Sequence, residues 1–493
     1  ELRVNLDYSL RTAVPGAAFQ VSVSELNGST VGLPTATVAV VASAGVGSRH
    51  EIVSIPWRNP RLWELGAPYL YLLRVDLVDE DGRTIDRHPA VRFGFREVWT
   101  EGRELILNGH PARLRLASFM YDVPHLIFYE GVGFNAFEVQ PNNHTWYGAE
   151  LFPTAAAQSG SKALLDAADE RGWAVLMPAP TAGLVRDRLL EPAVEAQYLK
   201  DTTSWFQRWD RKNRPSILMW SPAMNVGGGF QEYSPDRMGR KPIGPTPSWQ
   251  DKVKGLIKSL DPSRLVYFHQ TGQANDDVEM ENLYPNWMPL QEGEEYLSAW
   301  AESGDKPWGS VEYQHPVYCD YFKFMLLPHY TEYGAIYFGD RAYEKEKARY
   351  IEVALKAIQI REDRHGAPTR WTGAMDGETF QAWEDFEVAG AGFPYSPLPD
   401  STVHVGDWTT YYDVIDLFVR NTQRAWRAYG LNGGTFSWDI AANGVGDAPP
   451  GTFARADESL KQRPSWSNPL QDVYREVSQS LLVYLGGPPV RFT

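Results

Sequence analysis

The stretch Lys306-Pro-Trp-Gly-Ser-Val-Glu-Tyr-Gln-His315 predicts a short buried strand with a carboxylate, Glu312, at its C-terminal end. Trp308 and Val311 suit the interior of a strand, whereas Pro307 is tolerated at its start. Catalytic side chains of a (β/α)8 barrel come from the C-terminal ends of its strands, so a strand that ends in glutamate is a candidate catalytic element. Taken alone, the stretch favours a structural glutamate held in a salt bridge. A catalytic role for Glu312 needs support from the rest of the chain.

Strand-like runs alternate with helical runs from residue 112 onward, which is the pattern of a parallel barrel. Apolar residues recur at helical spacing in Ser161–Glu170 and in Gln250–Leu260, between expected strands. The eight expected strands, the number that a (β/α)8 barrel needs, are Arg113–Ser118, Phe134–Gln140, Ala174–Met177, Ser216–Trp220, Leu265–His269, Val278–Leu283, Trp308–Glu312 and Gly434–Trp438.

Residues 1–98 carry an all-β pattern. The runs Ala18–Ser24, Thr35–Val41 and Leu70–Val78 are β-branched or alternate between apolar and polar residues. Turn signals such as Asn27-Gly28 and Asp81-Gly82 separate them. The pattern predicts an antiparallel β-sandwich of immunoglobulin type with a scaffold role, followed by the (β/α)8 barrel over residues 99–493.

The expected seventh and eighth strands are far apart in the sequence. Between them, residues 317–430 include a strong helix pattern at Tyr343–Arg361, and Ala367–Thr410 is rich in Gly, Pro, Trp and Asp. Long excursions on the catalytic face of a barrel are usually lids or binding loops, so we expect residues 317–430 to lie over the mouth of the barrel. The alternative is that this segment holds a barrel strand near Arg370–Met375.

The composition excludes several classes of protein. The 493-residue chain carries 47 Lys and Arg against 62 Asp and Glu, a net charge of −15 that would repel nucleic acid. No apolar run approaches the roughly 20 residues of a transmembrane helix. With a single cysteine, Cys319, the chain can form neither an internal disulfide nor a thiolate metal cluster.

No motif in the sequence predicts a cofactor or a metal. There is no HExxH, and Gly227-Gly-Gly229 lacks the Lys-Ser/Thr of a phosphate-binding loop, so we interpret it as a flexible turn. The 18 Trp residues provide flat faces on which sugar rings can stack, although most of them are expected in the core. The chain starts at Glu1 without Met, which fits the removal of a leader and predicts a secreted or periplasmic protein.

Several uncommon elements follow one another where the two expected domains meet. Trp63 and Pro68-Tyr-Leu-Tyr71 precede Phe93-Gly-Phe-Arg-Glu97, which precedes Leu105-Ile-Leu-Asn-Gly-His-Pro111. In order and spacing they resemble glycoside hydrolase family 2, in which a β-sandwich with W…P-x-LY and FGFRE is followed by an L-NG-x-P hairpin that opens the catalytic barrel. The resemblance implies a retaining glycosidase that acts on a β-linked oligo- or polysaccharide without a cofactor. The sugar-binding domain of that family would lie upstream.

The resemblance also implies two catalytic glutamates, a nucleophile ending the seventh strand and a general acid/base ending the fourth. Glu312 fits the position of the nucleophile. With the junction pattern as context, this catalytic interpretation of Glu312 is favoured over the structural one. Asn213-Arg-Pro-Ser-Ile-Leu-Met-Trp-Ser221 resembles the family's HPSIxxWS, but the family's following NE corresponds to Met224-Asn225 or, shifted by one residue, to Asn225-Val226. Asparagine cannot transfer a proton as a carboxylic acid does, so the acid is missing from its expected place.

Three alternatives follow from the missing acid. The acid could be replaced by Glu232, which follows the glycine turn, or by Glu138, on the second strand where the family has an arginine. Without a catalytic role, Glu232 would be an exposed loop glutamate and Glu138 a paired carboxylate. Acidic residues of the excursion, such as Asp376 or Glu378, could serve instead. Otherwise the protein has lost hydrolysis and is a carbohydrate-binding or assembly protein on a degenerate glycosidase scaffold.

The residues expected to bind a sugar share a position at the predicted strand ends or in the excursion, so that they would converge on one face of the barrel. Each of them, taken alone, fits an ordinary rim or core residue equally well. They are Asn142, Asn143, His144, Trp220, His269, Tyr284, Tyr313, Trp371, Trp438 and Asp439.

Overall fold

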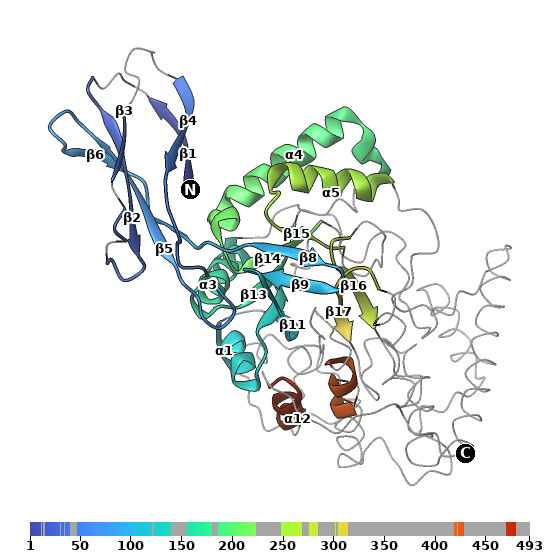
Figure 1. Ribbon diagram of the computed structural model, residues 1–493. Coiled ribbons are helices and arrows are strands. Elements are labelled where there is room, and N and C mark those ends of the chain that lie inside the picture. Colours follow the sequence, from blue (N-terminus) through green and yellow to red (C-terminus); the bar gives the residue numbers. More distant parts are fainter. Residues whose placement is uncertain are drawn as a thin grey trace, which may run out of the picture.

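The computed structural model describes residues 1–120 apart from 11, 13–14, 30, 34 and 40–46, together with 123–139, 155–179, 186–222, 248–268, 276–283, 301, 304–313, 419–421, 423–427 and 470–479. Figure 1 shows a β-rich N-terminal part beside a larger part that is built around parallel strands and flanked by helices. None of the helices in the described ranges is long and apolar enough to cross a membrane.

Two antiparallel sheets form the N-terminal part. One contains β1 (Leu2–Leu10) and β4 (Gly47–Ile55). The other has the order β3 (Ala36–Ala39), β2 (Ala18–Glu25), β5 (Tyr71–Val78) and β6 (Thr84–Arg87), with β7 (Val91–Phe93) also paired to β5. Alternate residues of the strands are apolar and pack between the sheets; among them are Val4, Leu6, Phe19, Val21, Val53 and Ile55. The sheets are therefore packed face to face.

A short antiparallel hairpin joins the sandwich to the barrel. Its strands are β8 (Val98–Glu101), β9 (Glu104–Leu107) and β10 (His110–Pro111). Asn108 and Gly109 turn the chain with φ angles of 53° and 84°, the conformation that an Asn-Gly pair adopts most easily. Leu105 and Leu107 belong to the core inside the barrel. Because the hairpin leads directly into the first barrel strand, it closes the end at which the strands begin.

Seven parallel strands in the described part of the chain build the barrel. The strands β11 (Leu116–Met120), β12 (Ala136–Val139), β13 (Ala174–Pro178), β14 (Ile217–Ser221) and β15 (Leu265–Val266) pair in sequence order, and β16 (Glu279–Leu283) pairs with β17 (Trp308–Tyr313). The backbone N–H of Asp277 donates to the carbonyl oxygen of Val266 at 2.9 Å, which connects β15 to β16. β17 contacts β11, so the strands curve around a common interior.

Side chains of these strands alternate between an inner and an outer core, as strand geometry requires. The inner core includes Ala136, Ala174, Leu176, Leu265 and Met280. The outer core includes Phe137, Val175, Met177, Val266 and Phe268, which pack against the helices.

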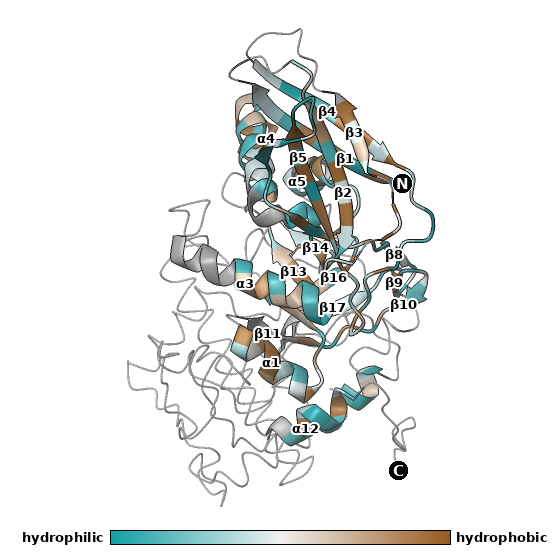
Figure 2. Cartoon of the chain, turned by 90° about the vertical axis from the view of Figure 1, so that its left-hand side faces the viewer, coloured by the Kyte–Doolittle hydropathy of each residue, from teal (hydrophilic) through white to brown (hydrophobic). Residues whose placement is uncertain are grey.

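Helices follow the first four barrel strands and cover the outer core. They are α1 (Val123–Val132), α3 (Ala155–Arg171), α4 (Pro192–Gln207), which lies between the short 3-10 helices η2 (Arg186–Leu190) and η3 (Arg208–Asn213), and α5 (Ser248–Leu260). Figure 1 shows α4 and α5 side by side, and the Lys252 ammonium lies 2.8 Å from the Glu195 carboxylate between them. In Figure 2 hydrophilic residues cover much of α4 and of α12 (Leu470–Val477).

Buried Asp169 connects the sandwich to the barrel. Asp169 of α3 accepts hydrogen bonds from the Arg214 guanidinium at 2.8 Å and from the Ser216 hydroxyl at 2.5 Å, and its backbone carbonyl accepts one from the Trp63 indole at 2.8 Å. Burial raises the pKa of Asp169, while Arg214 and Ser216 act in the opposite direction. Trp63, part of the junction pattern, therefore anchors the sandwich to the barrel's helix layer.

The first seven predicted barrel strands each overlap an observed strand. The fifth is shorter than predicted, because β15 ends at Val266 and not at His269. In the sandwich, β1 and β4 were not among the predicted strands. The predicted eighth strand, 434–438, lies outside the described residues, as does most of 317–430; within that segment the structure describes a helical piece at 419–421 and 423–427.

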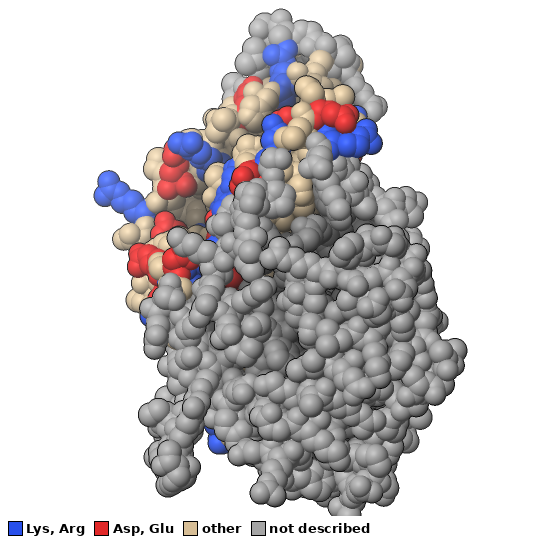
Figure 3. Space-filling model, turned by 90° about the vertical axis from the view of Figure 1, so that its right-hand side faces the viewer, with Lys and Arg blue, Asp and Glu red and all other residues tan. Residues whose placement is uncertain are grey.

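The described surface carries mixed charge. On the face shown in Figure 3, Lys and Arg side chains lie among Asp and Glu side chains wherever residues are described. Charges of both signs are therefore interspersed on this described part of the surface.

Candidate active site

Buried polar side chains gather towards the C-terminal ends of the barrel strands, opposite the hairpin. Glu138 is the third residue of β12, Ser221 is the last residue of β14, and Tyr267 follows β15 directly. All three are fully buried. Residues two apart on a strand share a face, so Glu138 lies on the same face as Ala136 of the inner core.

Tyr267 and Glu138 are joined across the inside of the barrel. The Tyr267 hydroxyl donates a 2.5 Å hydrogen bond to Glu138 Oε1. Burial, together with the negative charge of Glu138, raises the pKa of Tyr267 well above 10, and a hydrogen bond from Ser221 acts in the opposite direction. Tyr267 therefore keeps its proton at neutral pH and is the donor in this pair.

Glu312 lies one residue before the end of β17, where the structure describes its backbone. Met280 of β16 pairs with Gly309 and Glu281 pairs with Ser310, but Asn282 pairs with Glu312, so Val311 is an extra residue in β17. A one-residue shift exchanges the faces to which later residues of a strand belong. Glu312 thus shares a register position with Asn282, two residues after Met280 of the inner core.

Tyr313 follows Glu312 and pairs with Leu283 at the end of β16, and here too the structure describes the backbone. The remaining predicted site residues lie outside the described ranges, and their roles stay predictions. They are Asn142, Asn143, His144, Asn225, Glu232, His269, Tyr284, Trp371, Trp438 and Asp439.

Comparison with known families agrees with the order of sandwich and barrel. Residues 2–96 match the model of the glycosyl hydrolases family 2, and residues 163–322 match the TIM barrel domain of the glycosyl hydrolases family 2. Together the two matches cover just over half of the chain. The chain is a glycoside hydrolase family 2-like protein.

Individual relatives are distant from the family 2-like chain. A β-galactosidase of Alteromonas mediterranea is 27% identical over 241 residues, which are 44% of this chain and 19% of that relative, so the chain spans less than a fifth of its length. Among solved structures, a β-glucuronidase of Bifidobacterium dentium with coumarin-3-O-glucuronide is 20% identical, with a TM-score of 0.43 over 64% of this chain and 50% of the other. A β-galacturonidase of Eisenbergiella tayi bound to galacturonate is 20% identical, with a TM-score of 0.41 over 63% and 53%.

Trp220 lies in the outer core of the barrel, although it was predicted to bind substrate. Its ring stacks on Phe206 with centroids 4.6 Å apart, and its indole N–H donates to Asp261 at 2.8 Å. The physical reason is a register shift in β14, after which Leu218 and Met219 both belong to the inner core and Trp220 belongs to the outer one. This placement corrects the prediction for Trp220.

Tyr267 and Ser221 were not predicted as site residues of the family 2-like chain. A signal for Tyr267 was present, because alternation along the predicted fifth strand places it on the same face as Leu265. Its contact with Glu138 spans 129 positions of sequence, and no local pattern reveals such a pair. Ser221 was quoted as part of the fourth-strand pattern but received no role.

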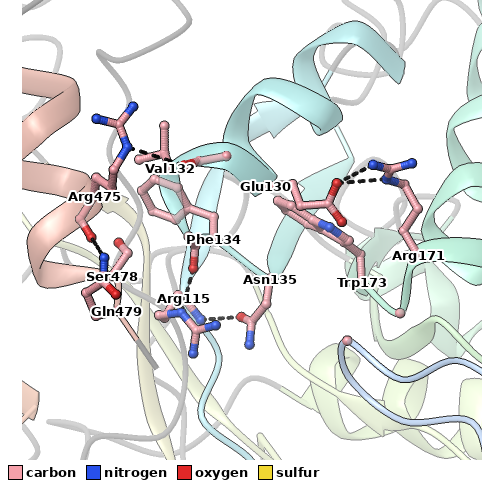
Figure 4. A pocket seen from close by; sticks show the side chains of 14 residues that line it. Arg115, Glu130, Val132, Phe134, Asn135, Arg171, Trp173, Arg475, Ser478 and Gln479 are labelled. Carbon is pink, nitrogen blue, oxygen red and sulfur yellow. Dashed lines mark hydrogen bonds and ion pairs between the residues drawn. The ribbon is translucent and has the colours of Figure 1, made fainter. Parts of the chain in front are cut away.

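A cavity of about 370 Å³ lies at the opposite end of the barrel, where β11, β12 and β13 begin (Figure 4). The Arg115 guanidinium there donates to the carbonyl oxygen of Gly133 at 2.6 Å, just after the end of α1, and burial lowers its pKa to about 10. Arg171 binds the Glu130 carboxylate at 2.9 Å, and Arg475 of α12 reaches Gly131. These contacts connect α1, α3 and α12 at the N-terminal end of the barrel strands. In such barrels this end contributes to stability and not to catalysis.

In the described ranges no group of three or more His, Cys, Asp or Glu side chains could hold a metal ion.

Proposed function

We propose that this family 2-like chain hydrolyses a β-linked glycoside of an oligo- or polysaccharide with retention, and that Glu312 is the nucleophile. The observation that carries the proposal is the backbone position of Glu312 near the C-terminal end of β17, in a barrel whose other end is closed by the hairpin. Catalytic residues of such barrels come from this end of the strands. The family match over residues 163–322 includes this strand.

Retention requires two displacement steps at the anomeric carbon. In the first step the Glu312 carboxylate forms a bond to that carbon, and the bond from the carbon to the leaving-group oxygen breaks. In the second step water attacks the same carbon, the bond to Glu312 breaks, and a base takes the proton from the water. The second step thus needs another group with an acceptor for a proton.

We assign the base to Glu138. In an eight-stranded barrel the second and fourth strands are equally distant from the seventh, so a carboxylate on β12 can act opposite β17 as one on β14 would. Tyr267 donates to Glu138 Oε1, so this oxygen of Glu138 is a hydrogen-bond acceptor. Glu138 then serves the second step, and the first step has no general acid at the expected place, where the sequence has Asn225.

The missing acid restricts the glycosides that this mechanism can cleave. A sugar alkoxide is a poor leaving group, and loss of general acid catalysis costs roughly 10²–10⁴-fold in rate. A dinitrophenolate leaves without a proton and avoids this loss. We expect the purified chain to cleave dinitrophenyl β-glycosides, the galactoside and the glucuronide included, far faster than unsubstituted oligosaccharides.

The test measures dinitrophenolate release by the wild-type chain and by Glu312→Gln, with the anomeric configuration of the first product followed by proton NMR. We expect a β-configured first product from wild type and no turnover by the variant. Turnover that survives in Glu312→Gln, or a product of inverted configuration, would refute the assignment of the nucleophile. A wild type that cleaves natural oligosaccharides efficiently would show that an acid exists elsewhere, and Glu232→Gln and Glu378→Gln would then be tested.

The second candidate function is a non-catalytic carbohydrate-binding or assembly protein on the same scaffold. The specific observation in its favour is that Asn225 stands where the family has a catalytic glutamate. It would be supported if oligosaccharides bind in calorimetry while no glycoside of any kind reacts. Retention of Glu312 favours the hydrolase.

The proposal also covers the domains, the mouth of the barrel and the location of the protein. We propose that the sandwich of residues 1–98 is of immunoglobulin type, that 99–493 form the barrel unit, and that 317–430 lie over its mouth. The predicted sugar-binding residues outside the described ranges would line that mouth. Export to the periplasm or the medium is proposed as well; fractionation of cells that express the full-length gene would test it.

A further inference from the structure

We infer that Tyr267 is a positioning residue, which holds the carboxylate of Glu138 in one orientation inside the barrel and links it to the end of β14. The inference rests on the proposed function, because it concerns the base of the second step. It adds a residue to the site that has no counterpart among the predicted catalytic or sugar-binding residues.

The contact has the geometry of a strong hydrogen bond. Its oxygen–oxygen distance is 2.5 Å, at the short end of the range for a hydroxyl that donates to a carboxylate. Both side chains are fully buried in the described structure. A carboxylate in such a place is costly unless a donor satisfies it, and Tyr267 provides that donor.

A packing role alone would not require the hydroxyl of Tyr267. Its neighbours in the inner core are apolar, with Leu265 two residues earlier and Met280 on the next strand, and phenylalanine would fill the same volume. A buried tyrosine hydroxyl is normally retained because it has a hydrogen-bond partner. The partner here is the carboxylate of the residue assigned as base.

The hydroxyl of Tyr267 also lies between two strands of the site. A hydrogen bond from Ser221 reaches it from the end of β14, and its own proton points to Glu138 of β12. The backbone supports this arrangement, because the Tyr267 N–H donates to the Trp220 carbonyl at 3.1 Å and the Ala179 N–H donates to the Ser221 carbonyl at 2.7 Å. Hydrogen bonds thus connect Glu138, through the Tyr267 hydroxyl, to Ser221. Ser221 is the last residue of β14, and the family's acid/base would follow it in the sequence.

The test separates the two chemical steps by rapid mixing of the full chain with a dinitrophenyl β-glycoside. The initial burst of dinitrophenolate reports attack by Glu312, and the steady-state rate reports hydrolysis of the glycosyl-enzyme. We expect Tyr267→Phe to leave the burst rate unchanged and to lower the steady-state rate by about 10- to 100-fold, the effect of one hydrogen bond to a charged group.

The matched control is Tyr198→Phe, which removes the hydroxyl of another buried tyrosine, on α4 in the outer core. It should change neither phase. Glu138→Gln should lower the steady-state rate at least as much as Tyr267→Phe, and the double variant should lose no more than Glu138→Gln alone. Thermal unfolding of every variant, followed by circular dichroism, shows that each is folded.

Four results would overturn the inference. If Tyr267→Phe matches wild type in both phases, Tyr267 does not position the base. If the two phases fall equally, its effect is on the fold as a whole. If its loss adds in full to that of Glu138→Gln, the residues act separately. If wild type gives neither burst nor turnover, the proposed function fails first and the inference fails with it.

Discussion

The Arg96 guanidinium donates a 2.7 Å hydrogen bond to the carbonyl oxygen of Ile217, the first residue of β14. Two further bonds reach the carbonyl oxygens of Pro215 at 3.1 Å and Ser263 at 3.2 Å. Burial, with a smaller effect of Arg264, lowers the pKa of Arg96 to about 9, so the side chain remains charged at neutral pH. Arg96, the arginine of the FGFRE pattern, therefore holds the start of β14. The family's general acid is expected at the other end of this strand.

Arg96→Ala should destabilise the chain by about 2–3 kcal/mol, because three carbonyl oxygens at the junction lose a charged donor. Arg96→Lys keeps the charge but cannot reach three acceptors in one plane, so its loss should be smaller. Urea unfolding at neutral pH measures both. Arg83→Ala, at an 80% exposed side chain, is the control and should stay within about 0.5 kcal/mol of wild type. An Arg96→Ala variant as stable as this control would contradict the anchoring role.

Two glycines should respond to alanine in opposite directions. A Cβ on Gly94 would lie 2.9 Å from Pro215 Cγ and 3.1 Å from the Tyr69 carbonyl oxygen, so Gly94→Ala should cost about 1–3 kcal/mol. A Cβ on Gly255 of α5 meets nothing within 4 Å, so Gly255→Ala should stabilise by about 1 kcal/mol through helix propensity. Thermal unfolding of both variants under one condition decides the prediction, and equal signs would contradict it.

The order of the barrel strands was predictable because strands that are buried on both faces are continuous apolar runs. The β14 segment Ile-Leu-Met-Trp and the β13 segment Ala-Val-Leu-Met are examples. The hairpin was predictable for another reason, since Asn108-Gly109 between apolar strands is the strongest local turn signal. β1 was overlooked although its alternation of Leu2, Val4 and Leu6 is regular.

The site was predictable in part. Glu312 could be placed on the seventh strand by its spacing, but the faces to which strand residues belong depend on bulges that local patterns do not reveal. The shift in β14 moved Trp220 to the outer core, and a similar shift in β17 precedes Glu312. Tyr267 joins the candidate site only through its contact with Glu138, which is distant in sequence and depends on closure of the barrel.

The stability of the chain should fall in acid partly because of Asp261. Burial would raise its pKa, but the Arg264 guanidinium at 2.6 Å, with Ser263 and the Trp220 indole, holds it well below the ordinary value of 3.8. The folded state therefore favours the carboxylate, and this contribution is complete above pH 3.8 and is lost as the pH falls below that value. Asp261→Asn should cost about 3 kcal/mol at neutral pH, because the Arg264 charge loses its buried partner.

Urea unfolding from about pH 7 to about pH 2 measures this contribution. The difference in stability between wild type and Asp261→Asn should be constant near neutral pH and should shrink as the pH falls below 3.8. Asp81→Asn, at a side chain 66% exposed, should follow the wild-type curve throughout. A difference that stays constant down to the lowest pH would show that the charge of Asp261 is not what stabilises the fold.

Asn225→Glu should restore cleavage of natural β-glycosides if the first step lacks only a general acid. The substitution places a carboxylic acid at the position after β14 where the family has one, and general acid catalysis is worth roughly 10²–10⁴-fold for an alkoxide leaving group. Release of dinitrophenolate should hardly change, because that leaving group needs no proton. Asn225→Gln has the length of glutamate without its proton and should give no gain with either substrate. If Asn225→Glu leaves oligosaccharide hydrolysis at the wild-type level while dinitrophenyl glycosides still react, proton donation at this position is not what limits the proposed reaction.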